Sequence, residues 1–424
     1  MLIMYNFDLI VIGSGPGGHN AALLAAKNKL KVAIFEKNPE MLGGVCLNEG
    51  CIPLKGMIYY SNFEKDYKNI KTKVFEKVKM LRNGLKLRME NSGIKIINSC
   101  AFLKSNNEVY ADDKIYTAKN IIIASGSTPK KIFNKKNVFT SEKIFELYDL
   151  PKKILVIGGG VVGCEYACLF NKLGADVTII EIMPMILPGF DNEILNYFLR
   201  ELKKKKINLL LASEIVEIKE ENIVTVINEN NKIEEKYDLI IETTGRKPNS
   251  ENFKNAGIKI DKNGFIEVND EYRTSFNNVF AIGDCINTPM LAYTASKEAE
   301  IVIDIILGKK VKPINYDEIP KIVFSFPQVG MVGNTKNEED TKIIKYFFKA
   351  NGKAFVEGKE TGFIKLFVKN NTIKGACVLG NDIAELLNEL SVIINNKINI
   401  QDIKDTIHIH PSYNEIILDA LNYG

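Results

Sequence analysis

The same short succession of strand, glycine loop, helix and strand occurs twice in this chain of 424 residues. The first copy spans residues 7–36 and the second spans residues 152–181, and an acidic residue (Glu36 or Glu181) follows the third glycine of each loop by 18 positions. The glycines of the two Gly-x-Gly-x-x-Gly loops are Gly13, Gly15, Gly18, Gly158, Gly160 and Gly163. A single loop of this kind is a weak signal, but two complete copies predict an α/β fold with two dinucleotide-binding units.

Each part of the repeated unit has a physical role. The first glycine permits a tight turn, the second lets backbone N–H groups approach a pyrophosphate, and the third lets helix and strand pack closely. The helix N-terminus adds partial positive charge, and Glu36 and Glu181 are expected to accept hydrogen bonds from ribose hydroxyls. A carboxylate at Glu181 repels a 2′-phosphate, and no arginine lies between Glu181 and Asp191. The second unit is therefore predicted to prefer NAD to NADP.

Two closely spaced cysteines follow the first unit. Cys46 and Cys51 lie in the run Gly-Gly-Val-Cys-Leu-Asn-Glu-Gly-Cys-Ile-Pro of residues 43–53. A Cys-x4-Cys spacing alone is also typical of two buried cysteines, but beside a dinucleotide unit it indicates a redox disulfide, which exchanges two electrons as a pair. Pro53 suits the first turn of a helix, so Cys51 is expected at a helix N-terminus, where the dipole favours a thiolate.

Composition narrows the class of protein. Apolar residues make up 46% and charged residues 25%, and 56 basic residues face 52 acidic ones, so the chain is typical of a globular protein and nothing points to nucleic acid. No apolar stretch reaches the ~18 residues of a membrane span, and the first strand begins too near Met1 for a signal peptide. Seven cysteines are too few for a secreted disulfide scaffold. These features predict a cytoplasmic protein, and no metal-binding cluster is expected.

Several further segments are expected to end at ligand sites. Residues 121–126 and 239–245 have the composition of buried strands that end in glycine turns, at Ser125, Gly126 and Gly245. Residues 279–284 are expected to form another buried strand, with Asp284 at its carboxyl end, where open α/β sheets bind ligands. From about residue 313 strand-like and helical segments alternate, which suggests a separate α+β domain.

Together these landmarks resemble the pyridine nucleotide-disulfide oxidoreductases, the flavoprotein disulfide reductase family. The resemblance extends from Asp8 to about Leu418 and depends on the motifs at residues 43–55, 281–284, 289–292 and 408–415. It implies an α/β fold with two Rossmann-like domains, for FAD and NAD, and a C-terminal α+β domain that forms a homodimer. The implied segments are 1–149 for the first part of the FAD domain, 150–249 for the NAD domain, 250–312 for a return segment that completes the FAD domain, and 313–424 for the interface domain.

The resemblance also implies roles for single residues. Cys46 is expected to be the thiol that exchanges with substrate, and Cys51 the thiolate that lies against the flavin. Lys55 is expected near the flavin ring, paired with Glu165 from the helix of the second unit. The further positions implied in FAD binding are Gly43, Gly44, Lys55, Ser125, Gly126, Asp284, Leu291 and Ala292, and Gly245 is implied in NAD binding.

A histidine near the C-terminus is the candidate base. Thiol–disulfide exchange needs a proton acceptor near pH 7, which the imidazole of His410 can supply. Pro411 fixes the local backbone, and Glu415 can hold the ring and stabilise its imidazolium, as the acid of a triad does. By resemblance, this pair reaches across the homodimer to the cysteines of the other subunit, whereas His408 is interpreted as structural.

Within the family, the sequence is most similar to members that oxidise dihydrolipoyl groups with NAD. The implied partner is a lipoyl carrier domain of a 2-oxo acid dehydrogenase or glycine cleavage complex. Three alternatives stay open: a flavin-dependent reductase of a small thiol or disulfide, a mercuric reductase, which the absence of a second C-terminal cysteine pair disfavours, and a non-catalytic flavoprotein scaffold. Positions that differ from the family pattern bear more on the substrate than on the chemistry, and they are Leu54, Ser99, Ser125, Tyr293, Thr294, Gln328 and Asn414.

Overall fold

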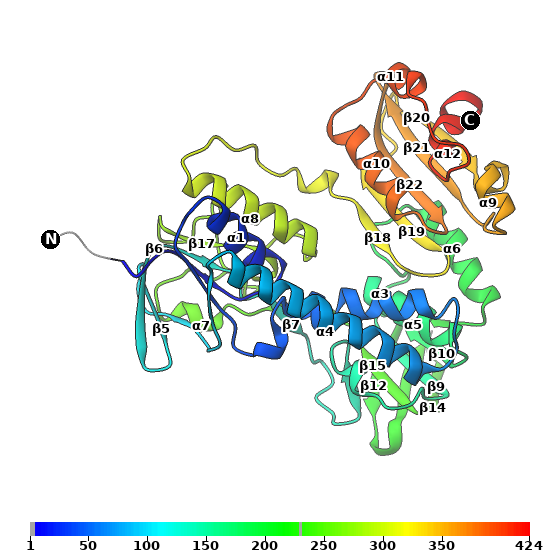
Figure 1. Cartoon of the computed structure of the whole chain (residues 1–424). Coiled ribbons are helices and arrows are strands. Elements are labelled where there is room, and N and C mark those ends of the chain that lie inside the picture. Colours follow the sequence, from blue (N-terminus) through cyan, green and yellow to red (C-terminus); the bar gives the residue numbers. More distant parts are fainter. Residues whose placement is uncertain (1–4, 229–230) are drawn as a thin grey trace.

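The computed structural model describes residues 5–228 and 231–424 and contains three domains built on sheets (Figure 1). In the first sheet the strand order is β3-β2-β1-β6-β5-β4, with β17 paired to β6. Strands β1, β2, β3, β17 and the second half of β6 run parallel, and β4 and β5 add an antiparallel extension. The strands are β1 (Phe7–Ile12), β2 (Val32–Phe35), β3 (Lys95–Ile97), β4 (Phe102–Leu103), β5 (Glu108–Ala111), β6 (Lys114–Ile123) and β17 (Val279–Ala281).

The first domain is assembled from two stretches of chain that are far apart in sequence. Strand β17 pairs with β6 through residues 279–281 and 121–123, so the chain returns to the first sheet after it has built the second. Helix α8 packs against α1, where a Cβ at Gly17 would lie 3.2 Å from the carbonyl oxygen of Ala295 (Figure 1). The helices of this domain are α1 (Pro16–Lys27), α2 (Gly44–Asn48), α3 (Cys51–Tyr60), α4 (Tyr67–Asn91), α7 (Glu251–Lys254) and α8 (Ala292–Ile306).

The second domain repeats the parallel arrangement on a smaller scale. Its strand order is β11-β10-β9-β15-β8, and helix α5 follows its glycine loop as α1 follows the first loop. A three-stranded antiparallel sheet packs against the large sheet through a shared apolar cluster. The elements are β8 (Val138–Thr140), β9 (Lys153–Ile157), α5 (Val161–Lys172), β10 (Asp176–Ile180), α6 (Asn192–Lys204), β11 (Asn208–Leu210), β12 (Ser213–Ile218), β13 (Ile223–Asn228), β14 (Asn231–Lys236) and β15 (Leu239–Glu242).

Two short antiparallel strands, β7 (Ser127–Pro129) and β16 (Arg246–Pro248), form the double connection between the first two domains.

The C-terminal domain is an antiparallel sheet in the order β18-β19-β22-β21-β20, with its helices packed on it. Its elements are β18 (Lys321–Val323), β19 (Gln328–Gly333), β20 (Lys342–Phe347), α9 (Gly352–Val356), β21 (Phe363–Lys369), β22 (Thr372–Gly380), α10 (Ala384–Asn395), α11 (Ile400–Asp405) and α12 (Glu415–Tyr423). The predicted α/β architecture with a separate C-terminal α+β domain is confirmed.

One apolar cluster joins parts of all three domains. It contains Leu54 and Met57 of α3, Val156 of β9, and Val329 and Phe363 of the C-terminal sheet, all of them buried. Helix α3 is therefore held in place by the second and third domains as well as by its own.

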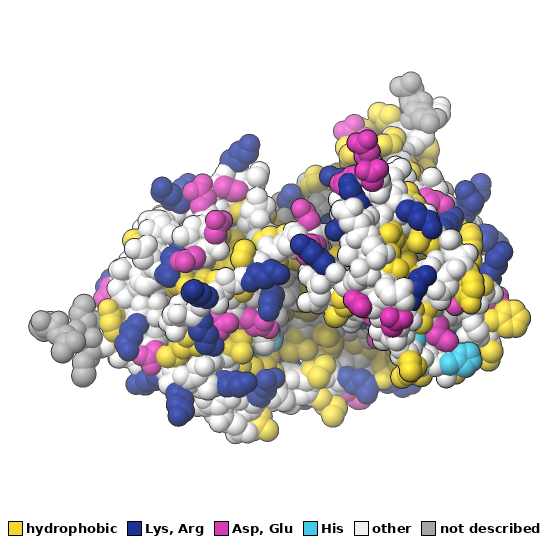
Figure 2. Space-filling view, turned by 90° about the horizontal axis from the view of Figure 1, so that it is seen from above, with side chains coloured by type: hydrophobic (Ala, Val, Ile, Leu, Met, Phe, Trp, Pro, Cys, Tyr) yellow, Lys and Arg dark blue, Asp and Glu magenta, His cyan; other side chains and the backbone are white. Residues whose placement is uncertain are grey.

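Basic and acidic side chains are interspersed on the face shown in Figure 2. None of the helices in the described part of the chain is long and apolar enough to cross a membrane.

The second and third glycines of each glycine loop differ in whether the folded chain has room for a side chain. A Cβ at Gly18 would lie 1.9 Å from the carbonyl oxygen of Gly13, and a Cβ at Gly163 would lie 2.0 Å from that of Gly158. The third glycine of each loop is therefore required by packing. In contrast, a Cβ at the second glycine, Gly15 or Gly160, would meet no atom within 4 Å. The φ angles there, −58° and −74°, are open to any residue, so the folded chain itself does not require glycine at these two positions.

This difference can be tested in the second loop. We expect Gly163→Ala to destabilise the protein by at least about 2 kcal/mol, because the new methyl group overlaps a backbone oxygen. The matched control Gly160→Ala should cost less than about 1 kcal/mol, since only the N-cap preference changes. Thermal unfolding of both variants without added nucleotides measures the difference. Equal melting temperatures would contradict the packing argument.

Candidate active site

The two cysteines lie where two helices meet. Cys46 is half-buried in α2, and Cys51 is exposed at the first position of α3. Gly50 lets the helices approach, because a Cβ there would lie 2.9 Å from the carbonyl oxygen of Val45 and 3.2 Å from the Cα of Cys46. In the reduced form the two sulfurs interact, with the Cys46 thiol as hydrogen-bond donor and the Cys51 sulfur as acceptor.

This hydrogen bond gives the two sulfurs unequal acidity. It lowers the pKa of Cys51 to about 7, although desolvation of the sulfur by the surrounding protein opposes the shift. The positive charge of Lys55 adds to the lowering, while Glu165 opposes it. The same bond, together with burial, raises the pKa of Cys46. In the reduced pair Cys51 is therefore the sulfur that ionises first, and the proton stays on Cys46.

The ion pair between Lys55, on the helix that begins with Cys51, and Glu165 connects all three domains. Lys55 Nζ of α3 lies 2.6 Å from Glu165 Oε2 of α5, and the Glu165 side chain is only 1% exposed. The other carboxylate oxygen, Oε1, accepts the backbone N–H of Phe324 at 3.0 Å, and Lys55 Nζ lies 5.3 Å from the centroid of the Phe324 ring. Phe324 directly follows β18 of the C-terminal domain. The structure thus brings Lys55 and Glu165 together as the sequence predicted, and it adds a third partner.

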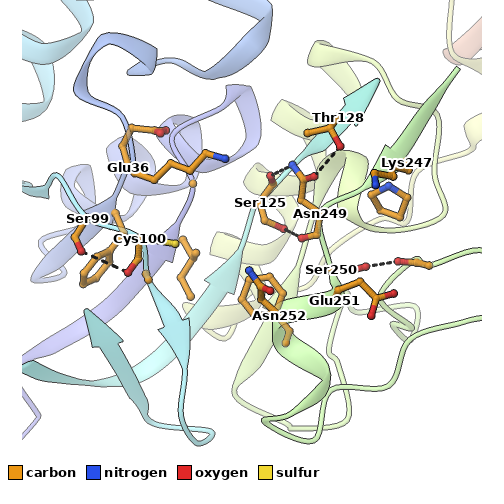
Figure 3. Close-up of a pocket in the computed structure, with 18 of the residues that line it drawn as sticks. Glu36, Ser99, Cys100, Ser125, Thr128, Lys247, Asn249, Ser250, Glu251 and Asn252 are labelled. Atoms are coloured by element: carbon orange, nitrogen blue, oxygen red, sulfur yellow. Dashed lines mark hydrogen bonds between the residues drawn. The ribbon is translucent and has the colours of Figure 1, made fainter. Parts of the chain in front are cut away.

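A cavity of about 550 Å³ lies beside the first glycine loop (Figure 3). Glu36, at the end of β2, accepts a hydrogen bond from the Ser14 hydroxyl at 2.5 Å and from the backbone N–H of Asn38 at 3.1 Å. The Ser14 hydroxyl accepts the N–H of Gly43 at 3.1 Å, so this carboxylate fixes both the loop and the start of the cysteine segment. On the opposite wall, Ser125 Oγ donates to the carbonyl oxygen of Asn249 at 2.6 Å.

The Asp284 carboxylate is held by residues that the sequence analysis did not identify. The Ser127 hydroxyl donates to Asp284 Oδ2 at 2.6 Å, and Arg246 Nε donates to Ser127 Oγ at 2.6 Å. Arg246 also pairs with Glu142 at 2.8 Å. Only the position of Arg246 directly after Gly245 could have drawn attention to it, because the contact depends on the pairing of β7 with β16.

The second glycine loop has the same arrangement as the first. Glu181, at the end of β10, accepts the N–H of Gly159 at 2.7 Å and of Met183 at 2.8 Å. Gly245 has a φ of +103°, and its carbonyl accepts the N–H of Lys130 at 2.9 Å. Both carboxylates thus lie beside a glycine loop at the carboxyl ends of parallel strands, which is the position of a dinucleotide ribose in such folds.

The space beside the second glycine of each loop shows whether the pyrophosphate of a dinucleotide can be accommodated there. Among residues 5–228 and 231–424, no atom beyond the neighbouring residues of the chain lies within 4 Å of a Cβ at Gly15 or Gly160, and each of these glycines is the N-cap of a helix. Backbone N–H groups and the partial positive charge of a helix N-terminus would face a pyrophosphate in that space. The chemistry of both loops therefore fits a dinucleotide.

The histidine and glutamate near the C-terminus are paired. His410 Nδ1 lies 2.8 Å from Glu415 Oε1, and the backbone N–H of Ser412 donates to Glu415 Oε2 at 2.7 Å. Burial works against ionisation of Glu415, but the Ser412 N–H and the imidazole outweigh it, so its pKa lies below the usual value. The His410 side chain is 78% exposed. Its ring is held in orientation while its second nitrogen stays open to a partner.

The two groups are not brought together within one chain. No hydrogen bond between described residues joins His410 or Glu415 to Cys46 or Cys51. Helix α12, which begins with Glu415, belongs to the C-terminal domain. Helix α3, which begins with Cys51, belongs to the first domain and lies apart from α12 (Figure 1).

Several positions that differ from the family pattern have partners in the structure. Leu54 is buried in the apolar cluster under α3. The Tyr293 hydroxyl donates to the carbonyl oxygen of Pro320 at 2.6 Å, and Gln328 Oε1 accepts the N–H of Ile383 at 3.0 Å. The side-chain amide of Asn414 donates to Glu389, and another oxygen of Glu389 lies 2.7 Å from His408 Nε2.

The structure also places the remaining positions that the resemblance implied in FAD binding. Leu291 is the N-cap of α8 and Ala292 is its first residue. The carbonyl oxygen of Gly126 accepts the N–H of Asn249, Gly44 is the first residue of α2, and Ser99 lines the cavity.

Comparison with known proteins identifies the class. A family described as pyridine nucleotide-disulphide oxidoreductase matches residues 7–299, and its dimerisation domain matches residues 319–421. The chain belongs to the pyridine nucleotide-disulfide oxidoreductase family, as the resemblance predicted. This family uses FAD and a nicotinamide dinucleotide, and the dimerisation domain supports a homodimer.

Individual relatives agree with this assignment. The chain is 33% identical to the dihydrolipoyl dehydrogenase of Chlamydia pneumoniae and 34% identical to that of Bacillus subtilis (strain 168), in each case over 97% of this chain and 95% of the relative. The solved structure of the Cu(II) complex of the HOCl-induced flavoprotein disulfide reductase RclA from Escherichia coli has a TM-score of 0.90 at 26% identity, over 97% of this chain and 98% of that chain. LpdA from Mycobacterium tuberculosis, at 21% identity and a TM-score of 0.89, has the same fold.

The influence of Lys55 on Cys51 can be measured directly. In the reduced protein, alkylation of Cys51 by iodoacetamide should follow a thiolate with a pKa of about 7. We expect Lys55→Met to raise this midpoint and to slow alkylation at pH 7 by about threefold or more, because the nearby positive charge is lost. Mass spectrometry of the labelled peptide gives the rates across a pH series. Lys77→Met, at an exposed position of α4, is the matched control, and an unchanged midpoint in Lys55→Met would contradict the electrostatic account.

Proposed function

We propose that this protein is an NAD-dependent dihydrolipoyl dehydrogenase, which oxidises dihydrolipoyl groups on a carrier domain and reduces NAD. The observation that carries the proposal is the Cys46–Cys51 pair, which lies where α2 meets α3, beside the Lys55–Glu165 ion pair. Such a pair is suited to taking two electrons from a dithiol. The dihydrolipoyl dehydrogenases among the curated relatives, 31–34% identical over nearly their whole length, support the choice of substrate.

The cofactor assignment follows from the two loops. FAD is assigned to the first domain, with Glu36 toward its ribose, Ser125 and Asp284 as further polar contacts, and Gly15 leaving room for its pyrophosphate. NAD is assigned to the second, beside Glu181 and Gly160. When bound, FAD supplies two-electron transfer between the cysteine pair and the nicotinamide. Glu181 favours NAD, because its carboxylate would repel a 2′-phosphate.

The exchange of thiols proceeds between this chain's own sulfurs and the substrate. His410 of one subunit takes the proton of a dihydrolipoyl thiol bound at the other subunit, and Glu415 stabilises the imidazolium. The substrate thiolate attacks Cys46 of the Cys46–Cys51 disulfide, so that the S–S bond breaks and Cys51 leaves as the thiolate. The second substrate thiol then attacks the substrate sulfur of the mixed disulfide, which closes the oxidised lipoyl ring. Cys46 is released, and its sulfur takes up the proton of that second thiol.

Another flavin-dependent disulfide reductase is the second candidate, because the RclA structure matches nearly the whole chain. In such an enzyme electrons pass through the same cysteine pair in the opposite direction, from a nicotinamide donor to a small disulfide acceptor. Comparison of NADH-driven reduction of a small disulfide with NAD-driven oxidation of dihydrolipoamide, on one flavin-loaded preparation, separates the two. Turnover of the small disulfide alone would favour the second candidate.

The first expected outcome concerns the nucleotide. With dihydrolipoamide as donor, we expect kcat/KM for NAD to exceed that for NADP by about 100-fold or more, since the negative charge of the Glu181 carboxylate opposes the added phosphate. In Glu181→Ala the ratio should fall by at least about tenfold, mainly through a better KM for NADP. The control Glu193→Ala alters an exposed carboxylate of α6. A preference that is independent of residue 181 would refute this assignment.

The second outcome concerns the acid–base pair. We expect Glu415→Gln to lower kcat for dihydrolipoamide by about 10²-fold or more, because a neutral amide cannot stabilise the imidazolium. Reduction of an artificial dye by NADH should remain within about twofold of the unaltered protein, since that reaction needs no thiol proton transfer. Stopped-flow and steady-state assays of both reactions give the ratio. Equal losses in the two reactions would assign Glu415 to general stability instead.

A further inference from the structure

A buried carboxylate lies under the turn that carries Asp284. The Glu298 side chain belongs to α8 and is fully buried, with 0% exposure. Its Oε2 accepts the backbone N–H of Gly283 at 2.6 Å, and its Oε1 accepts the hydroxyl of Tyr316 at 2.9 Å. The Tyr316 hydroxyl also lies 2.9 Å from the hydroxyl of Tyr272. These contacts form a continuous network from the turn at the end of β17 to residue 316.

This carboxylate is costly for the fold. None of the ion pairs among the described residues includes Glu298, so only neutral donors compensate its burial. Burial raises its pKa, and the neighbouring Asp284 adds to the effect, whereas the Gly283 N–H and the Tyr316 hydroxyl lower it. A buried carboxyl without a cation destabilises a protein, and in the part of the chain that the structure describes only hydrogen bonds from the Gly283 N–H and the Tyr316 hydroxyl offset that cost. Its presence therefore calls for a role other than packing.

The two ends of the network indicate what the role is. Gly283 has a φ of +71° and directly precedes Asp284 at the carboxyl end of a parallel strand, where this fold binds its ligand. Tyr316 lies in the short 3₁₀ turn Tyr316–Glu318, within the linker between α8 and β18, which opens the C-terminal domain. The carboxylate thus joins the flavin-binding turn to the entry of the dimerisation domain.

We propose that Glu298 is a positioning residue for the flavin: its carboxylate fixes the Gly283–Asp284 turn and, through Tyr316, couples that turn to the linker of the dimerisation domain. The charge has a second effect, because a buried negative charge near the flavin opposes the addition of electrons. The network therefore holds the flavin in place and also keeps its reduction potential low. This role requires only that the protein is a flavoprotein of its family, and it is independent of the identity of the dithiol.

The test uses the full chain and two measurements that need no substrate. The first is the dissociation constant of FAD from the apoprotein, and the second is the midpoint potential of the bound flavin. We expect Glu298→Gln to weaken FAD binding by about tenfold or more, because its amide cannot accept both hydrogen bonds as the carboxylate does. The potential should become more positive, because the negative charge is lost while the shape is kept.

Two further variants make the test specific. Glu300→Gln is the matched control: the same substitution two residues further along α8, at an exposed carboxylate that pairs with Lys297, where solvent screens the charge. It should leave both quantities unchanged. Tyr316→Phe retains the charge and removes the hydrogen bonds of the Tyr316 hydroxyl to Glu298 and Tyr272, so it should weaken FAD binding severalfold.

The proposal is wrong if Glu298→Gln and Glu300→Gln have the same FAD dissociation constant and the same flavin potential, even when the melting temperature of Glu298→Gln is lower. If Glu298→Gln does not fold, Tyr316→Phe decides the question, and an unchanged FAD dissociation constant in that variant overturns the coupling.

Discussion

The contact between Lys55 and Glu165 is the interaction on which the arrangement of this molecule depends. It places a charged amine from the cysteine-bearing helix against a buried carboxylate of the second domain, and that carboxylate also accepts a backbone N–H of the third domain. A buried carboxylate must be compensated, so the three domains have to meet at this point. The same amine lowers the pKa of Cys51. Domain assembly and thiol chemistry are therefore coupled through a single side chain.

A second common feature is the use of carboxylates to hold glycine loops. Glu36 and Glu181 accept hydrogen bonds from residues within or next to their loops, and Glu298 does the same for the turn before Asp284. Each site pairs an acceptor oxygen with backbone or hydroxyl donors at the carboxyl end of a parallel strand. Polar groups that are satisfied in this way give a loop one defined conformation, which a cofactor site needs before its ligand arrives.

Much of this was predictable because the information is local. The strand–loop–helix units, the cysteine pair at the start of a helix and the His410–Glu415 spacing each occupy a short stretch of chain, in which residue order dictates geometry. Lys55 and Glu165 were paired through a resemblance, not through physical reasoning on the sequence. Among the residues that were missed, Ser127 and Arg246 make contacts between segments more than 100 residues apart in the chain. Glu298 and Tyr316 are only 18 residues apart, but their contact depends on how the linker after α8 folds back.

The sequence by itself determined the type of chemistry: two dinucleotide units, a two-electron sulfur pair and an imidazole with its acid. These depend on residue identity and on spacings within single stretches of about 30 residues or fewer. Only the tertiary structure decided what compensates each buried carboxylate: Lys55 and a backbone N–H of the third domain for Glu165, and the Gly283 N–H and the Tyr316 hydroxyl for Glu298. Such properties depend on burial and on charges brought close by folding, and neither of these is encoded in a local pattern.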